Sequence, residues 1–247
     1  MSSKRLTNLY HCTKSDSLLK ILGSKCFKYS YCLEEFYMPY ANRYVVENFA
    51  YAMVCFADFL DEEVSEHMEQ FSADSYIVMD KIWAIDNGLS PVIYYNKKSL
   101  PHGSLLFLTK SIGRLVENGI TGAREMRNAL ELLRPYYKLY KGHYFIKGSN
   151  KKSNDPVEFF LEREWRSIAA VTGGEHYFLG EKDYLNEDIR NKASQELLDH
   201  KYCLRFEWDD IKQIGCKEGE KNVILHTIHE SFGVDEDEAE SKIVLLA

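Results

Sequence analysis

The segment FLEREWRS, residues 160–167, decides how the rest of the chain is interpreted. It carries two carboxylates and two guanidinium groups, and the apolar run IAAV follows it directly. This composition predicts a strand over residues 159–171, in which side chains alternate between the two faces. Glu162, Glu164 and Arg166 would then share one face of that strand.

Two carboxylates so close together repel each other, so one of them should have a raised pKa unless Arg166 relieves the repulsion. Such a carboxylate can stabilise the positive charge that develops on a sugar carbon when a glycosidic bond breaks. Glu164, assisted by Glu162, is therefore our catalytic hypothesis. An exposed strand edge with a Glu/Arg ladder gives the same pattern, contributes little to stability, and is favoured by this segment alone.

The second informative segment is LYHCT, residues 9–13, which we interpret as a short strand. Its alternation places His11 and Thr13 on one face, with Tyr10 and Cys12 on the other. A neutral imidazole beside a hydroxyl group could hydrogen-bond a ribose. A histidine at a strand end whose ring bonds to backbone is the alternative, and this motif alone favours that alternative.

The bulk composition is that of an ordinary globular protein. The 247 residues are 45% hydrophobic and 28% charged, with a net charge of −7, which argues against a non-specific nucleic-acid binder. No apolar run is long enough for a membrane helix and no signal-peptide core follows the N-terminus, so we expect a cytoplasmic protein without membrane contact. None of the six cysteines forms a Cys-x-x-Cys pair, which indicates free thiols.

Several motifs with a known chemistry are missing. There is no Gly-x-Gly-x-x-Gly or Gly-x-x-x-x-Gly-Lys-Ser/Thr phosphate loop, no Gly-x-Ser-x-Gly elbow and no His-Glu-x-x-His. His226 and His229 have helical spacing, but no third ligand lies near them in the sequence. We therefore expect no metal site.

Apolar periodicities alternate between helix and strand without a regular βαβ rhythm, which predicts an α+β fold with a mixed, mostly antiparallel sheet and flanking helices. We expect one domain over residues 1–247 with a helical insertion at about 100–140, broken by glycines at 119–122. The expected strands are 9–13, 52–56, 76–79, 91–95, 143–147, 159–171 and 202–207. The expected helices outside the insertion are 61–71, 81–87, 187–200 and one that begins at Ser15 or Asp16.

Taken together, the segments LYHCT, MVCFADFL, DKIWAIDNGLSPVIYY and EREWRS carry a resemblance to known proteins. Their order along the chain resembles the ADP-ribosyltransferase superfamily, and the segments themselves are still more similar to the AbiGi-type abortive-infection family of bacterial phage defence. The resemblance implies a split-sheet, ADP-ribosyltransferase-like fold that binds NAD.

The resemblance also implies roles for individual residues. Glu164 would hold the 2′-hydroxyl of the nicotinamide ribose, and Glu162 would activate the acceptor. His11 would hydrogen-bond a ribose of NAD. The remaining NAD-binding residues would be Tyr10, Thr13, Phe56 and Arg166, and those that recognise the target would be Lys151 and Lys152.

Two functions follow from this reading. The first is an NAD-dependent ADP-ribosyltransferase of phage defence that transfers ADP-ribose to a nucleic acid or protein acceptor, with NAD as substrate and no metal. The alternative is a non-catalytic antitoxin or regulator of an abortive-infection pair that binds a toxin partner. In that alternative, the acidic chain would mask a basic toxin through complementary charge.

Overall fold

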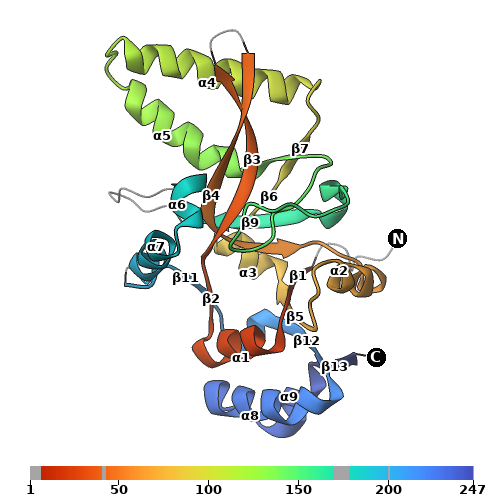
Figure 1. Cartoon of the computed structure of the whole chain (residues 1–247). Helices are drawn as coiled ribbons and strands as arrows, with labels where there is room; N and C mark the ends of the chain where they lie inside the picture. The colour runs from red at the N-terminus through yellow and green to blue at the C-terminus, as the bar shows by residue number, and fades with distance from the viewer. Residues whose placement is uncertain (1–6, 41–42, 170–177, 200, 247) are drawn as a thin grey trace.

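The computed structural model describes residues 7–40, 43–169, 178–199 and 201–246 (Figure 1). Within these residues the largest sheet has nine strands, and all its pairings are antiparallel except that of the last two. The structure thus confirms a mixed α+β fold with a mostly antiparallel sheet and flanking helices. The nine strands are β1 (Asn8–Thr13), β3 (Ser30–Tyr40), β4 (Arg43–Ala57), β5 (Ser75–Asp80), β6 (Ser90–Pro91), β9 (Glu164–Ile168), β10 (Phe178–Gly180), β12 (Ile211–Lys217) and β13 (Ile243–Leu246).

The strand order is β13-β12-β5-β1-β4-β9-β6, and β3 and β10 also pair with β4. The long strand β4 is where the sheet forks. Met53 pairs with Ser30 of β3 on one edge and with β9 on the other. Four residues later Ala57 still pairs with β9, but its other neighbour is Tyr10 of β1. Strands β1 and β3 therefore share one edge of β4 at different points, and the sheet is split between them.

Helices cover both faces of the sheet. On one face, α1 and α8 enclose the largest hydrophobic cluster, with Leu18 and Ile228 packed among residues of β1, β4 and β5. On the other face, Val64 and Met68 of α2 pack against Tyr10. The helices are α1 (Ser15–Ser24), α2 (Val64–Gln70), α3 (Lys81–Asp86), α4 (Leu100–Glu117), α5 (Ala123–Leu133), α6 (Glu181–Leu185), α7 (Glu187–Asp199), α8 (Lys221–Phe232) and α9 (Glu236–Ser241).

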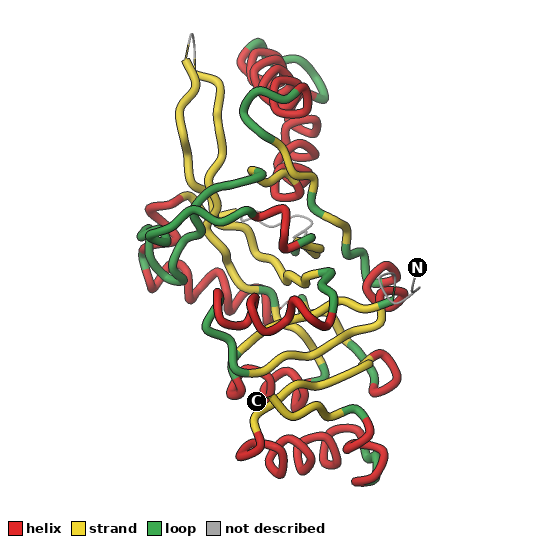
Figure 2. Tube along the Cα trace, turned by 90° about the vertical axis from the view of Figure 1, so that its right-hand side faces the viewer, coloured by secondary structure: helices red, strands yellow, loops and turns green. Residues whose placement is uncertain are grey.

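Helices α4 and α5 form an arm at one end of the molecule, alongside the outer part of the β3–β4 hairpin (Figures 1 and 2). They occupy the predicted helical insertion, and the glycine-containing break between them is confirmed, with Gly119 and Gly122 at positive φ. Their shared core is small, consisting of Leu105, Ile112 and Leu130 with two neighbours. Much of the apolar surface of α4 is therefore left exposed.

Two small sheets complete the fold, one from β2 (Cys26–Lys28) with β11 (Cys203–Arg205) and one from β7 (Ile93–Tyr95) with β8 (Tyr137–Leu139). Strand β8 runs beside β7 and brings the end of the helical arm back to the fork. Residues Tyr137–Leu139 were predicted to be part of the helical insertion, but they form a strand.

Some predicted elements are wrong. Residues 143–147 form no strand, because this segment makes only an isolated bridge from Phe145 to Lys152. The strand predicted at 159–171 begins with a 3-10 turn, Phe159–Glu162, and becomes extended only at Glu164. Strand β3 was missed because the adjacent Glu34 and Glu35 interrupt its run of aromatic and apolar residues. Ala170, Val171 and His200 lie outside the described residues.

Gly215 of β12 lies opposite Tyr76 of β5, and a Cβ atom there would overlap the tyrosine ring. We predict that Gly215→Ala lowers the free energy of unfolding by about 1–3 kcal/mol, as overpacking does in cores. Urea unfolding measures the effect. Gly219→Ala is the matched control, since a Cβ atom there meets no atom within 4 Å. Equal stability of the two variants would contradict the close packing of Tyr76.

Candidate functional site

The candidate site is a cavity of about 330 Å³ at the fork, between β1 and β3. Five of the residues singled out in the sequence line it, from three separate parts of the chain. Glu162 and Glu164 thus line the same cavity as His11, but the pairing of Tyr10 with Ala57 and of Ala57 with Glu164 places the His11 side chain on the opposite face of the sheet from Glu164. The five are Tyr10, His11, Phe56, Glu162 and Glu164.

A local backbone feature places Glu164. Arg163 has a φ of 43°, in the left-handed region that few non-glycine residues occupy, and it ends the 3-10 turn. Its Nε donates to the Asp58 carbonyl at 2.6 Å, which holds the turn against the end of β4. Strand β9 starts at the next residue, and alternation then buries Glu164 and Arg166 on one face. The shared face predicted for these two residues is confirmed.

Glu162 reaches the cavity by a different route from the one predicted. It belongs to the 3-10 turn rather than to the strand, so strand alternation cannot align it with Glu164. Lys138 of β8 brings the two carboxylates together, with its Nζ 2.8 Å from Glu164 Oε2 and 3.2 Å from Glu162 Oε2. The same ammonium group lies 4.3 Å from the centroid of the Phe159 ring.

Arg166 is fully buried and completes an ion network. Its Nε and Nη2 donate to the two oxygens of Glu164 at 2.6 and 2.9 Å, a bidentate pair. Its Nη1 donates to Glu34 of β3 at 2.9 Å. Three carboxylates and two cations thus alternate through the interior, from Glu34 to Glu162. Arg166 lies behind Glu164 and is not among the residues that line the cavity.

The pKa values of Glu162 and Glu164 are shifted in opposite directions. Burial opposes ionisation of Glu164, but Arg166 and Lys138 outweigh it and hold the pKa of this carboxyl well below its usual range. Burial raises the pKa of Glu162, and Lys138 offsets the effect only in part. One carboxyl of the pair, that of Glu162, does have a raised pKa, but the main cause is burial and not the repulsion from Glu164 on which the prediction was based.

His11 is held by backbone and aromatic contacts. Its Nδ1 donates to the Cys55 carbonyl at 2.8 Å, and its ring lies 5.2 and 5.3 Å from the rings of Phe27 and Phe56. Burial lowers its pKa, which favours the neutral imidazole at physiological pH. This is the environment of the backbone-bonded histidine that the sequence analysis kept as its alternative.

The other residues singled out lie outside this cavity. Thr13 lines a neighbouring cavity of about 380 Å³, which it shares with His11. Lys152 pairs with Glu35, whereas the exposed Lys151 side chain makes no ion pair within the described part of the chain. Lys152 belongs to a third cavity of about 340 Å³, which also shares Lys138 with the candidate site.

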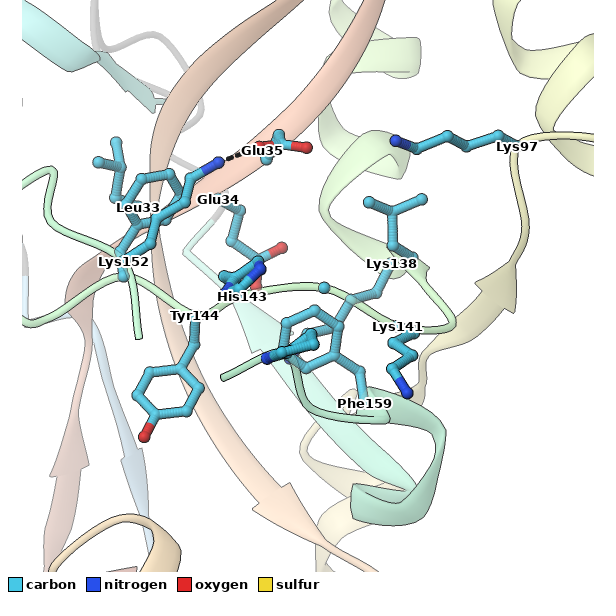
Figure 3. A pocket seen from close by; sticks show the side chains of 14 residues that line it. Leu33, Glu34, Glu35, Lys97, Lys138, Lys141, His143, Tyr144, Lys152 and Phe159 are labelled. Atoms are coloured by element: carbon cyan, nitrogen blue, oxygen red, sulfur yellow. Dashed lines mark hydrogen bonds and ion pairs between the residues drawn. The ribbon is translucent and has the colours of Figure 1, made fainter. Parts of the chain in front are cut away.

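Figure 3 shows this third cavity, with Lys152 bonded to Glu35 on one side and Lys97 reaching in from the other. Two residues of the ion network, Glu34 and Lys138, were missed by the sequence analysis. Glu34 lies on a strand that was not predicted, and Lys138 lay within a predicted helix. The signals were a pair of charges, Glu34 and Glu35, within an aromatic and apolar segment, and a lone Lys138 among tyrosines.

Residues 7–40, 43–169, 178–199 and 201–246 contain neither a candidate metal-binding cluster nor a helix that could cross a membrane. No group of three or more His, Cys, Asp or Glu side chains in these ranges could hold a metal ion. No helix in the same ranges is long and apolar enough to cross a membrane.

Removing one partner of a buried ion pair leaves an uncompensated charge. We predict that Arg166→Ala lowers the free energy of unfolding by about 3–5 kcal/mol, because Glu164 and Glu34 remain in the interior. Lys141→Ala is the matched control, since Lys141 pairs with Glu158 at the surface, and it should cost less than about 1 kcal/mol. Chemical denaturation compares the two variants, and equal losses would exclude the network as a major source of stability.

The opposite pKa shifts predict opposite pH trends. Ionised Glu164 stabilises the fold above the unfolded pKa of about 4.3, and this contribution is lost as pH falls toward its folded pKa. Glu164→Gln should therefore lose most stability near neutral pH and progressively less in acid. Glu162 has a raised pKa, so its contribution is present below the unfolded pKa and lost as pH rises through the folded value.

Glu162→Gln should consequently gain stability relative to the wild type as pH rises from mildly acidic to neutral. Urea-unfolding midpoints of both variants across this pH window provide the measurement. If the stability of both variants changed with pH in the same direction, the pKa values of Glu162 and Glu164 would not be shifted in opposite directions.

Comparison with known proteins places the chain in a family. No curated protein and no solved structure matches it. Residues 25–217, more than three quarters of the chain, match the family model "Putative abortive phage resistance protein AbiGi, antitoxin". The match supports abortive infection, phage defence and a toxin–antitoxin system, and it does not extend to the ADP-ribosyltransferase superfamily.

This description overturns our first functional expectation. An NAD-dependent ADP-ribosyltransferase is wrong for this chain, because the matching family is described as an antitoxin. The geometry agrees with the correction, since both oxygens of Glu164 are already held by cations within the protein. The chain belongs to the AbiGi family of abortive phage resistance proteins.

Proposed function

We propose that the protein is a non-catalytic antitoxin that neutralises a toxin by binding it, as one half of an abortive-infection pair. The family description supports this function, and it is the alternative that the sequence analysis had kept open. Such a protein needs a stable fold and a complementary surface, and it needs no reactive group. The buried charges at the fork then have a structural role.

The observation that carries the proposal is the saturation of Glu164. Arg166 donates to both of its oxygens and Lys138 to one of them, so the carboxylate is held by two cations of the chain itself. A pKa well below the usual range also makes this carboxyl a poor proton donor or acceptor near neutral pH. Both features favour a group that holds strands together.

The charge distribution supports a binding function. Residues 97–152 contain twelve Lys and Arg against three Glu, a net charge of +9, although the whole chain carries −7. The remainder therefore has a net charge of −16. Segregated charge steers association and selects partners. A partner could therefore bind either through the acidic remainder of the chain, as the sequence predicts, or through the basic segment 97–152.

Binding predicts stoichiometric neutralisation. Residual activity of the purified toxin of the pair should fall linearly as the protein is added and vanish near the equimolar ratio, with a complex visible by size-exclusion chromatography. A catalyst would act repeatedly instead. Complete inactivation of the toxin at a small fraction of the equimolar amount would contradict the proposal.

The same titration with Glu162→Gln tests whether the acidic pair takes part. This substitution removes a carboxylate from the cavity without leaving a buried cation unpaired, because Lys138 keeps Glu164. We expect an unchanged end point. If the variant bound the toxin but no longer neutralised it, Glu162 would have a chemical role in neutralisation, which contradicts the proposal.

A further inference from the structure

The first half of α4 carries large apolar side chains that are exposed. Leu100 is 87% exposed and Phe107 is 69% exposed, and Leu108 follows on the same side of the helix. Together with Tyr37 of β3, these residues line a groove of about 860 Å³. Large apolar side chains gathered in a groove mark an interaction surface rather than ordinary surface composition.

The rim of this groove is positively charged. Lys97 and Lys98 line it, and no Asp or Glu is among its described lining residues. Lys97 lies 4.5 Å from the centroid of the Tyr37 ring, and neither lysine forms an ion pair within the part of the chain that the structure describes. Arg114, one turn beyond Lys110, extends the positive side along the helix.

The N-terminus of α4 adds to this field. Its first turn contains no acidic residue, and the Ser99 hydroxyl donates to the Asn96 carbonyl instead of capping the helix. His102, in the same turn, lines the groove, is 6% exposed, and has an Nδ1 without a hydrogen-bond partner among the described residues. Buried polar atoms usually have a partner, so this wall retains hydrogen-bonding capacity for a bound molecule.

We propose that the groove along α4 is the docking site for an acidic, amphipathic segment of the toxin protein. The inference rests on the proposed antitoxin function and names the surface that performs it. Apolar side chains of the segment cover Leu100, Phe107 and Leu108. Its carboxylates face Lys97, Lys98 and the N-terminus of α4. The toxin therefore binds within the basic segment, residues 97–152, and not on the acidic remainder of the chain.

The apolar floor favours a protein occupant over a nucleic acid. Nucleic-acid interfaces are polar and gain most of their affinity from contacts between cations and phosphates. Phe107 and Leu100 line this groove, and a phosphate backbone would leave them without an apolar partner. An amphipathic protein segment satisfies both the apolar centre and the charged rim.

Two variants and two matched controls test the site in the full-length protein. Phe107→Asp disrupts the apolar floor, and its control is Ile82→Asp on α3, a residue that is also 69% exposed. The double variant Lys97→Glu/Lys98→Glu reverses the rim. Its control is Lys182→Glu/Lys192→Glu, which makes the same charge change on exposed residues of α6 and α7.

The toxin of the pair is the probe, and its affinity for each variant is measured by calorimetry at low and high salt. Both groove variants should weaken binding about tenfold or more, as substitutions at the centre of an interface do, while both controls bind like the wild type. Circular dichroism checks that each variant is folded. Groove variants that bind the toxin as tightly as the wild type would overturn the proposal.

Two other outcomes would also overturn it. If the groove variants lose binding to a short DNA duplex and keep the toxin, the occupant is a nucleic acid. If they only dissolve a dimer of the protein alone, seen by light scattering, the occupant is a second copy. Absence of any complex between wild-type protein and toxin would defeat the antitoxin function itself, which is distinct from failure of the groove.

Discussion

The rest of the structure depends on the hydrogen bonds and ion pairs of one buried group, the guanidinium of Arg166. It joins Glu164 of its own strand to Glu34 of β3, and it donates to the Pro135 carbonyl at the end of the helical arm. One side chain thus fixes β9, β3 and the arm relative to one another at the point where the sheet forks. The desolvation cost of burying it is offset because each neighbouring charge has an opposite partner.

Under the proposed antitoxin function, the acidic pair that the sequence predicts to be catalytic has a structural role instead. Paired carboxylates are typical of enzymes that act on sugars, and Glu162 and Glu164 do line one cavity. However, Lys138 and Arg166 neutralise Glu164, and the Cys55 carbonyl and two phenylalanine rings hold His11. The shared cavity is real, but its groups already have partners.

Local sequence predicted the parts of the fold that local forces determine. Strand β1, helix α3 and the break between α4 and α5 follow from apolar alternation and glycine positions, and the structure has them. The same reasoning aligned Glu164 with Arg166 correctly. It failed where long-range contacts decide the outcome. Strand β3 shows no regular period because Glu34 and Glu35 interrupt its apolar residues, and the pairing of Glu34 with the distant Arg166 cannot be read from the local sequence.

Lys138 illustrates the same limit at the site. Nothing in its neighbourhood of aromatic residues shows that two glutamates more than twenty positions later will surround its ammonium group. Composition was misleading in a similar way. The net charge of −7 is the sum of a basic segment, residues 97–152, and an acidic remainder. The antitoxin proposal depends on where the charges lie rather than on their sum.

The central claim is that the acidic pair at the fork is a structural ion network. A carbon-detected NMR titration of the side-chain carboxyls of Glu162 and Glu164 tests it most directly. The account predicts that the Glu164 signal stays that of an ionised group throughout the acid range in which the protein remains folded. Glu162 should titrate above the usual pKa of a glutamate. A Glu164 carboxyl that titrates at or above the ordinary glutamate value would contradict the account, since such a group would be free to exchange protons in the cavity.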